Sequence, residues 1–287
     1  MRAVKTLLLL TALTMLLVLG GDAIAGQQGM TFGLIIAVAM NGFAYFFSDK
    51  IALASSGAQP VTREELPRLY QVMERLVAKA RLPMPKLYVI PQAAPNAFAT
   101  GRNPSHASVA VTAGLMDLMN DDELEGVIAH ELSHVRNYDI LITSVAATLA
   151  GAITWIASMG RWAMLFGGFG GSRDDNRNGG GLAAILMLIL APVAALLIQL
   201  GISRQREFSA DASGVQMVGH ANGLISALEK LGAYNARIPM NVSPTTASLF
   251  IVAPLSGREL FSSLFQTHPP LSERIAVLRN MTITRVG

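Results

Sequence analysis

The sequence of 287 residues is 52% hydrophobic and only 14% charged, whereas soluble domains carry about 25% charged residues. It contains no cysteine, which excludes a disulfide framework, thiolate metal ligands and a cysteine nucleophile. The 22 basic and 19 acidic residues form no basic block, so the net charge of +3 does not indicate nucleic-acid binding and fits charge that flanks membrane segments.

Four apolar stretches are long enough to predict about four transmembrane helices in a mostly α-helical membrane protein. They are residues 4–20, 30–47, 140–160 and 182–202. The first two predict an N-terminal membrane hairpin over residues 1–47, joined by a loop at 21–29. An alternative is a signal peptide, because Ala23-Ile24-Ala25 follows a basic start and an apolar run. The last two predict a second hairpin over 140–202 around a Gly-rich loop at 161–181.

Charge predicts how these spans are oriented. Arg2 and Lys5 hold the N-terminus in the cytoplasm, and the loop at 21–29 has no lysine or arginine. Residues 48–139 and 203–287 are therefore expected to form the two parts of one cytosolic domain. The loop at 161–181 carries three arginines on the expected outer side, so a shallow second hairpin that does not fully cross stays an alternative.

Local patterns predict the elements of the cytosolic domain. Residues 60–81 have the spacing of an amphipathic helix, with an inner face of Leu66, Leu69, Val72, Met73, Leu76 and Val77. Residues 86–90 and 107–112 are expected to be strands, and residues 96–100 a third. Asn120 followed by Glu123 is typical of a helix N-cap with its returning acid. The domain is therefore expected to combine helices with a small β-sheet.

The helix that begins after Asn120 contains the stretch GVIAHELSHVRN, residues 126–137. Residues four apart share one helix face, so His130 and His134 can bind one ion, while Glu131 lies beside it. This is the H-E-x-x-H pattern, in which two histidines bind zinc and the glutamate is the general base. Histidines that face solvent would need no metal. The apolar neighbours, however, predict a buried helix, and burying two histidines and a glutamate costs free energy unless a bound metal compensates for it.

Catalytic zinc usually takes three protein ligands and a water. The candidates for the third ligand are His106, His220, His268 and the stretch SRQREFSADASG, residues 203–214. There Glu207 and Asp211 are four residues apart, which suits a ligand and a carboxylate that accepts a ligand histidine's free N–H. The alternative is a solvated helix face beneath the membrane, where Glu207 and nearby arginines meet lipid headgroups. Beside an incomplete H-E-x-x-H site, the ligand interpretation is favoured.

The segments AHELSHVRNYDIL, REFSADASG, PNAFATGR and HPPLSERI together resemble the HtpX family of membrane zinc metalloproteases, which is related to the Ste24 type of prenyl-protein endopeptidases. The resemblance implies a gluzincin-like α+β protease domain that faces the cytosol and holds one Zn²⁺. It implies His130, His134 and Glu207 as ligands, Glu131 as base and Asp211 behind a ligand. It also implies that residues 96–100 form an edge strand that pairs with substrate, through Asn96, Ala97 and Phe98, although an ordinary turn and strand is an equal alternative.

His268 is open to two interpretations: it donates a hydrogen bond in the transition state, or it caps the last helix, which Pro269 and Pro270 are suited to begin. The expected function is a multi-pass, bacterial-type inner-membrane endopeptidase that cuts membrane or misfolded proteins at the cytosolic face. Its partners would be protein or peptide substrates and the lipid bilayer; membrane quality control and a stress-response role come from the resemblance alone. The alternatives are a non-catalytic scaffold with a structural zinc and a protease that cleaves within the bilayer.

Overall fold

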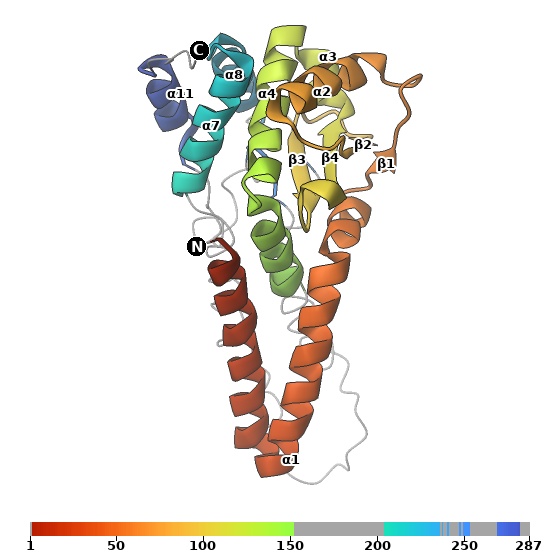
Figure 1. Ribbon diagram of the computed structural model, residues 1–287, viewed down its shortest axis with the longest axis vertical. Helices are drawn as coiled ribbons and strands as arrows, with labels where there is room; N and C mark the ends of the chain where they lie inside the picture. Colours follow the sequence, from red (N-terminus) through yellow and green to blue (C-terminus); the bar gives the residue numbers. More distant parts are fainter. Residues whose placement is uncertain are drawn as a thin grey trace.

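The computed structural model describes residues 2–151, 204–235, 237, 240, 247, 249–252 and 269–281. This part of the chain is mostly helical and carries one four-stranded mixed sheet, in agreement with the predicted combination of elements. In Figure 1 a helical hairpin forms the lower part, and the sheet and remaining helices pack around α4 in the upper part. The Gly-rich loop at 161–181 and the apolar run at 182–202 lie outside the described residues.

The hairpin is α1, Arg2–Ser55, which is interrupted only at Ala25 and Gly26. The predicted nine-residue loop at 21–29 is wrong, because helix continues on both sides of this two-residue break. Gly26 has φ of 59°, which glycine adopts without steric cost, so together with Ala25 it reverses the chain within two residues. The second arm, Ala25–Ser55, is 31 residues long and contains an 18-residue stretch of mean hydropathy 1.7, so it is long and apolar enough to span a membrane.

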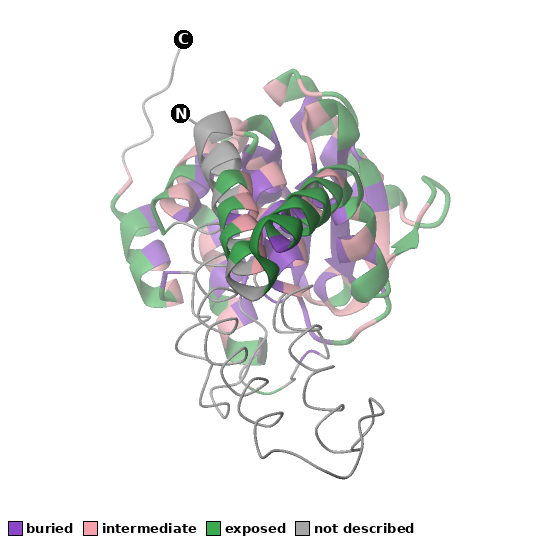
Figure 2. Ribbon diagram, turned by 90° about the horizontal axis from the view of Figure 1, so that it is seen from below, coloured by how far each residue is buried: buried purple, intermediate pink, exposed green. Residues whose placement is uncertain are grey.

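Small residues let the two arms approach closely. A Cβ added at Gly33 would lie 2.3 Å from the carbonyl oxygen of Leu17, which real side chains do not tolerate. The Asn41 amide donates to the hydroxyl of Thr14 at 2.9 Å and joins the arms across the interface. Most outward-facing positions on the second arm are exposed (Figure 2), and they include Phe32, Ile35, Val38, Phe43 and Phe46. Close packing inside and an apolar exterior are typical of membrane helices.

The third predicted apolar run begins as a helix, Asp139–Gly151, and its residues 152–160 lie outside the described part of the chain. This helix lies between the arms of the hairpin (Figure 1). Val145, Ala146 and Leu149 pack with Leu13 and Ala44 of the two arms. The segment that follows α4 is therefore held by the hairpin.

The amphipathic helix of the upper domain is α2, Pro67–Ala80, so the predicted start at residue 60 is wrong. Proline lacks an N–H and fits the first turn of a helix, and Pro67 therefore marks its beginning. Residues 59–60 instead form a short strand, and the Glu65 carboxylate accepts from the Thr62 N–H in the turn between. The predicted inner face is confirmed for five of its members, which are buried: Leu69, Val72, Met73, Leu76 and Val77.

The sheet has the strand order β1-β2-β4-β3. Its strands are β1 (Gln59–Pro60), β2 (Lys86–Ile90), β3 (Ala97–Gly101) and β4 (Ala107–Thr112). β2 and β4 are parallel, whereas β3 pairs antiparallel with β4. The predicted strands at 86–90 and 107–112 are confirmed, and the third is displaced by one residue from 96–100. β3 lies at the edge of the sheet beside α4.

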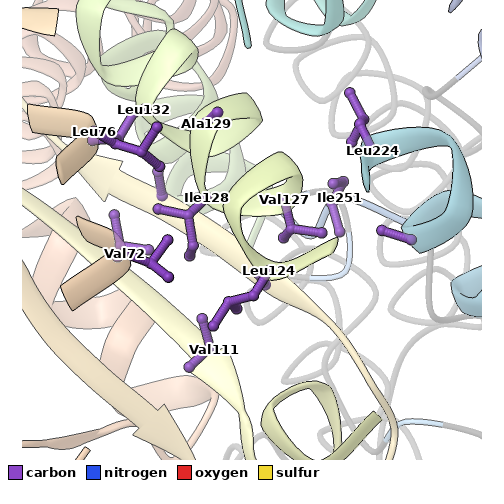
Figure 3. Packing of buried hydrophobic residues seen from close by; sticks show 14 of the residues in the cluster. Val72, Leu76, Val111, Leu124, Val127, Ile128, Ala129, Leu132, Leu224 and Ile251 are labelled. Carbon is purple, nitrogen blue, oxygen red and sulfur yellow. The ribbon is translucent and has the colours of Figure 1, made fainter. Parts of the chain in front are cut away.

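The upper domain is built around α4, Asp121–Arg136. The predicted N-cap is confirmed as a capping box, in which Asn120 and Glu123 each accept from the other's backbone N–H. Helices α7 (Arg204–Val218), α8 (Asn222–Asn235) and α2 and strand β3 all pack against α4. Figure 3 shows Val72 and Leu76 of α2, Val111 of β4 and Leu224 of α8 around α4. Helix α3 (Ala113–Leu118), the 3₁₀ turn Pro104–His106 and α11 (Leu271–Arg279) complete the described elements.

Candidate metal centre

Helix α4 presents the H-E-x-x-H residues on a buried surface. His130 and Glu131 are 0% and 2% exposed, respectively. Apolar residues hold this helix in the core, notably Val127, Ile128 and Leu132, and Figure 3 shows them pointing to different neighbours. The predicted buried setting of the motif is therefore confirmed.

Helix α7 supplies the acidic residues that face the motif. The buried residues of α7 are Glu207, Ala210, Asp211, Gly214 and Val215, which recur at helical spacing and form one face. A Cβ added at Gly214 would lie 3.1 Å from the backbone nitrogen of His130, tighter than most real contacts. The absence of a side chain at Gly214 thus lets α7 approach α4 closely enough for Glu207 and Asp211 to reach the histidines.

Three side chains converge on one point. His130, His134 and Glu207 each offer a ligand atom, and these atoms lie within 4.8 Å of one another. The Nε2 atoms of the two histidines are 3.2 Å apart. His134 Nε2 lies 3.4 Å from Glu207 Oε1, and His130 Nε2 lies 3.7 Å from Glu207 Oε2. Donors about 2.0–2.1 Å from a tetrahedral zinc are about 3.3 Å apart, so the three side chains fit this ion.

The other ring nitrogen of each histidine faces a carboxylate. His130 Nδ1 lies 2.8 Å from Asp211 Oδ1, and His134 Nδ1 lies 3.4 Å from Asp139 Oδ2. An Nδ1–H that donates to a carboxylate leaves Nε2 as the free lone pair. Both imidazoles are therefore oriented with Nε2 toward the metal position, as in carboxylate–histidine–zinc arrangements.

Arg274, on α11, completes the surroundings of Asp211. Its side chain is fully buried and donates to both oxygens of Asp211, at 2.8 and 2.7 Å. Arg274 Nη1 lies 3.7 Å from Glu207 Oε2. Its Nη2 is also 3.3 Å from His130 Nδ1, but that nitrogen is closer to Asp211 and cannot serve both as donor and acceptor. Asp211 is thus held between His130 and a buried guanidinium.

The electrostatics of the centre favour a cation. Burial opposes charge on His134, but the carboxylates of Asp139 and Glu207 outweigh it and raise the pKa of His134 to about 9. Burial raises the pKa of Glu131, and Glu207 contributes in the same direction. For Asp211, burial is outweighed mainly by Arg274, which lowers the pKa of that carboxyl. A site that stabilises a proton on His134 also favours a dication in its place.

The remaining predicted residues that the structure describes are not members of this ligand group. Asn96, Ala97 and Phe98 are all buried at the start of β3. His106 and His220, considered as third ligands, are exposed and do not belong to the group. His268 lies outside the described residues.

Two residues of the centre were not predicted from the sequence: Arg274 and Asp139. Leu271, Ile275 and Leu278 pack on or in the core, and Arg274 occupies the same face of α11. A lone arginine at helical spacing among apolar residues was a signal for a buried ion pair. The signal at Asp139 was weaker. This residue stands at the start of an apolar run, where an aspartate also suits the cap of a helix.

The chain is similar to known proteins along nearly its full length. The model of peptidase family M48 matches residues 63–282, more than half of the chain. "Protease HtpX homolog" of Desulfatibacillum aliphaticivorans is 56% identical over 96% of this chain and 88% of its own length. The protein of the same name from Pelotomaculum thermopropionicum is 50% identical over 99% of this chain and all of its own length.

Among solved structures, the crystal structure of S. mikatae Ste24p matches with a TM-score of 0.54. It is 20% identical, and the match covers 96% of this chain but only 65% of the Ste24p chain. This likeness shows the fold, and the long matches to the curated relatives show the family. The chain belongs to peptidase family M48, together with the HtpX homologues.

Proposed function

We propose that the chain is a membrane-bound, zinc-dependent endopeptidase. The observation that carries the proposal is the convergence of His130, His134 and Glu207 within 4.8 Å, with Glu131 buried next to the first of them. Two histidines and one glutamate are the ligands of catalytic zinc in several metallopeptidases. Membership of family M48 and the long apolar helix support the same function.

The residues of the centre have complementary roles in this proposal. When bound, zinc would supply an activated water at neutral pH and polarise the substrate carbonyl. Glu131 takes a proton from the attacking water and passes it to the leaving amine, as a general base and then a general acid. Asp211 and Asp139 keep the Nε2 atoms of their histidines directed to the metal position, and Arg274 fixes Asp211.

Substrates are proposed to be membrane or misfolded proteins that are cut at the cytosolic face, in membrane quality control. An extended substrate would add its backbone to the edge of β3 that faces away from β4, beside α4. The cytosolic location follows from the charges at Arg2 and Lys5. A protein fused to a reporter near Gly57, an open turn after the hairpin, should show cytosolic reporter activity. Activity only outside the membrane would contradict this orientation.

Two other functions are less well supported. A structural zinc in a scaffold requires a closed site with four protein ligands, and within the described residues the ligand group has three members. A protease that cleaves within the bilayer requires the metal at membrane depth. Here α4 begins with three acidic residues and packs in the upper domain, with the helix Asp139–Gly151 only starting after the motif.

The proposal is tested with Glu131→Ala in the zinc-loaded, full-length protein in detergent. The variant should lose casein hydrolysis while it keeps about one zinc per chain, because the base is not a ligand. Glu125→Ala is the matched control, since Glu125 lies on the same helix and its ion pairs among the described residues are with Arg75 and Lys79, at 3.6 and 3.5 Å. Near-wild-type hydrolysis by Glu131→Ala would refute the role of Glu131, and a wild-type protein without zinc-dependent hydrolysis would refute the function.

A further inference from the structure

The edge strand β3 has backbone groups that alternate between β4 and the free edge. In an antiparallel pair, successive residues point their N–H and C=O groups to opposite sides. The Asn96 carbonyl accepts from the Thr112 N–H, next to the pairing of β3 with β4. Ala97 and Ala99 must therefore direct their N–H and C=O groups away from β4, toward the edge where a substrate strand would pair.

Part of this edge is already occupied by the chain itself. The Ile251 N–H donates to the Ala97 carbonyl at 3.0 Å. The Asn96 side-chain amide donates to the Val252 carbonyl at 2.8 Å, and its oxygen lies 3.4 Å from the Val252 N–H. The same oxygen accepts from the Ala97 N–H at 3.1 Å. Asn96 thus bonds both backbone groups of Val252, as a neighbouring strand residue would.

The segment Ile251–Val252 is anchored from its other side too. Arg274 Nη1 donates to the Ile251 carbonyl at 3.0 Å, so all four backbone groups of the two residues have partners. The Ile251 side chain lies near Val127 and Leu224 in the core (Figure 3). The preceding Phe250 is fully buried and packs edge-on against Phe98, with ring centroids 5.0 Å apart. Buried, fully bonded backbone is costly to displace.

Farther along β3 the edge is different. Ala99 is the next residue whose backbone groups point away from β4, and no described residue forms a hydrogen bond with them. The hydroxyl of the following residue, Thr100, pairs with that of Ser144 at 2.7 Å, which fixes β3 against the helix Asp139–Gly151. Thr100 thus holds β3 in place next to the stretch of edge with which no described residue forms a hydrogen bond.

We propose that Ile251 and Val252 close the substrate-pairing edge at Ala97, so that a substrate backbone pairs with β3 only from Ala99 onward. Asn96 is then a positioning residue that holds this closing segment, rather than a group that binds substrate. The inference rests on the proposed function, and it defines where the recognition of substrate backbone ends.

The closing segment also connects that end to the metal centre. Arg274 bonds the Ile251 carbonyl with one nitrogen and Asp211 with two others, and Asp211 contacts the ligand His130. The end of the edge and the ligand are therefore held by one guanidinium. One shared side chain thus connects the position of the closed end to that of His130.

Hydrogen exchange tests the proposal in the zinc-loaded, full-length Glu131→Gln protein in detergent, with and without saturating casein. In fragments that contain residues 249–252, the backbone amide hydrogens should exchange slowly, and at the same rate with and without casein. Fragments of β3 that contain Ala99 should exchange about 10-fold more slowly with casein, as expected for one added backbone hydrogen bond. Faster exchange at 249–252 with casein would show a displaceable plug and would overturn the inference, as would unchanged exchange in β3.

Variants separate positioning from general destabilisation. Asn96→Asp loses the donor to Val252 and should speed exchange at 249–252 about 10-fold, with a higher KM and little change in kcat. Phe250→Leu is a second variant that loosens the same segment without altering Asn96. Val72→Ala, a buried change on α2 on the other side of α4, should leave exchange at 249–252 unchanged. An Asn96→Asp protein that exchanges like the Val72→Ala control would overturn the proposal.

The two proposals fail in different ways. A wild-type protein that binds casein along β3 without cutting it would refute the endopeptidase function, while the closed end would stand. A protein that cuts casein but exchanges rapidly at residues 249–252 would keep the function and refute the closed end.

Discussion

Replacement of Arg274 by methionine should show how much the buried guanidinium contributes to the fold and to the metal centre. Methionine fills a similar volume but cannot donate hydrogen bonds. The change removes both bonds to Asp211 and the bond to the Ile251 carbonyl. It leaves Asp211, 1% exposed, as a buried carboxylate whose remaining partner is His130.

The cost can be worked out from these contacts. Breaking a buried ion pair by removing one partner costs about 3–5 kcal/mol, because the other charge stays desolvated. Since His130 still donates to Asp211 at 2.8 Å, we expect the lower end, about 3 kcal/mol. At about 2–4 °C per kcal/mol for a domain of 150–250 residues, the melting temperature should fall by about 6–12 °C. Zinc affinity should fall about 10–100-fold, as is typical when support behind a ligand is lost.

The assay is thermal unfolding of the zinc-loaded protein in detergent, with zinc affinity measured by competition with a chelator. Arg279→Met is the matched control: it lies on the same helix, its side chain is 63% exposed, and its ion pair with Glu229 should contribute at most about 1 kcal/mol. The double variant Asp211→Leu/Arg274→Met removes both charges and should recover stability but not zinc affinity. If Arg274→Met melts like Arg279→Met, the buried pair does not stabilise the fold as argued.

Three further variants test the ligands and the support of α4. Glu207→Ala should lose zinc on metal analysis and become sensitive to proteolysis in detergent, whereas Asp211→Asn should bind zinc about 10–100-fold more weakly; full zinc content in Glu207→Ala would place the third ligand elsewhere. Glu123 is buried, yet hydrogen bonds from Lys230 and Ser226 outweigh burial and lower its pKa below 4.5. Its stabilising effect is therefore complete above that pH and is lost as the pH falls below it. The stability of the Glu123→Gln variant should therefore depend less on pH in this range. An unchanged dependence of stability on pH would contradict the role of Glu123.

Local patterns predicted the elements whose signals are local. Strands 86–90 and 107–112 lie where β-branched and apolar residues cluster. The capping box formed by Asn120 and Glu123 marks the start of α4. The predicted start of α2 was too early because the apolar periodicity extends to residues before Pro67. The helix begins at Pro67, which lacks a backbone N–H and therefore fits the first turn. Positions that depend on distant contacts were harder to foresee. The pairing of Ile251 with Ala97 and of Arg274 with Asp211 joins segments that no spacing rule connects.

The motif HPPLSERI illustrates the difference. Its histidine was interpreted as a hydrogen-bond donor in the transition state or a helix cap, and its prolines as the start of a helix. Both interpretations concern residues 268–270. The arginine four residues later was overlooked, although charges are almost never fully buried unless paired. Its position among Leu271, Ile275 and Leu278 required a partner in the core. The identity of that partner, Asp211, follows only from the packing of α11 against α7.

The placement of Arg274 has a consequence for biosynthesis. Ribosomes make the chain from the N-terminus, so the hairpin, the H-E-x-x-H helix and α7 emerge before α11. Until residue 274 has been made, Asp211 has no guanidinium partner and the Ile251 carbonyl has no donor from α11. The nascent chain therefore passes through its insertion steps with an unfinished catalytic centre. A chain made in this order can complete the contacts of Asp211 and Ile251 only after α11 has been made.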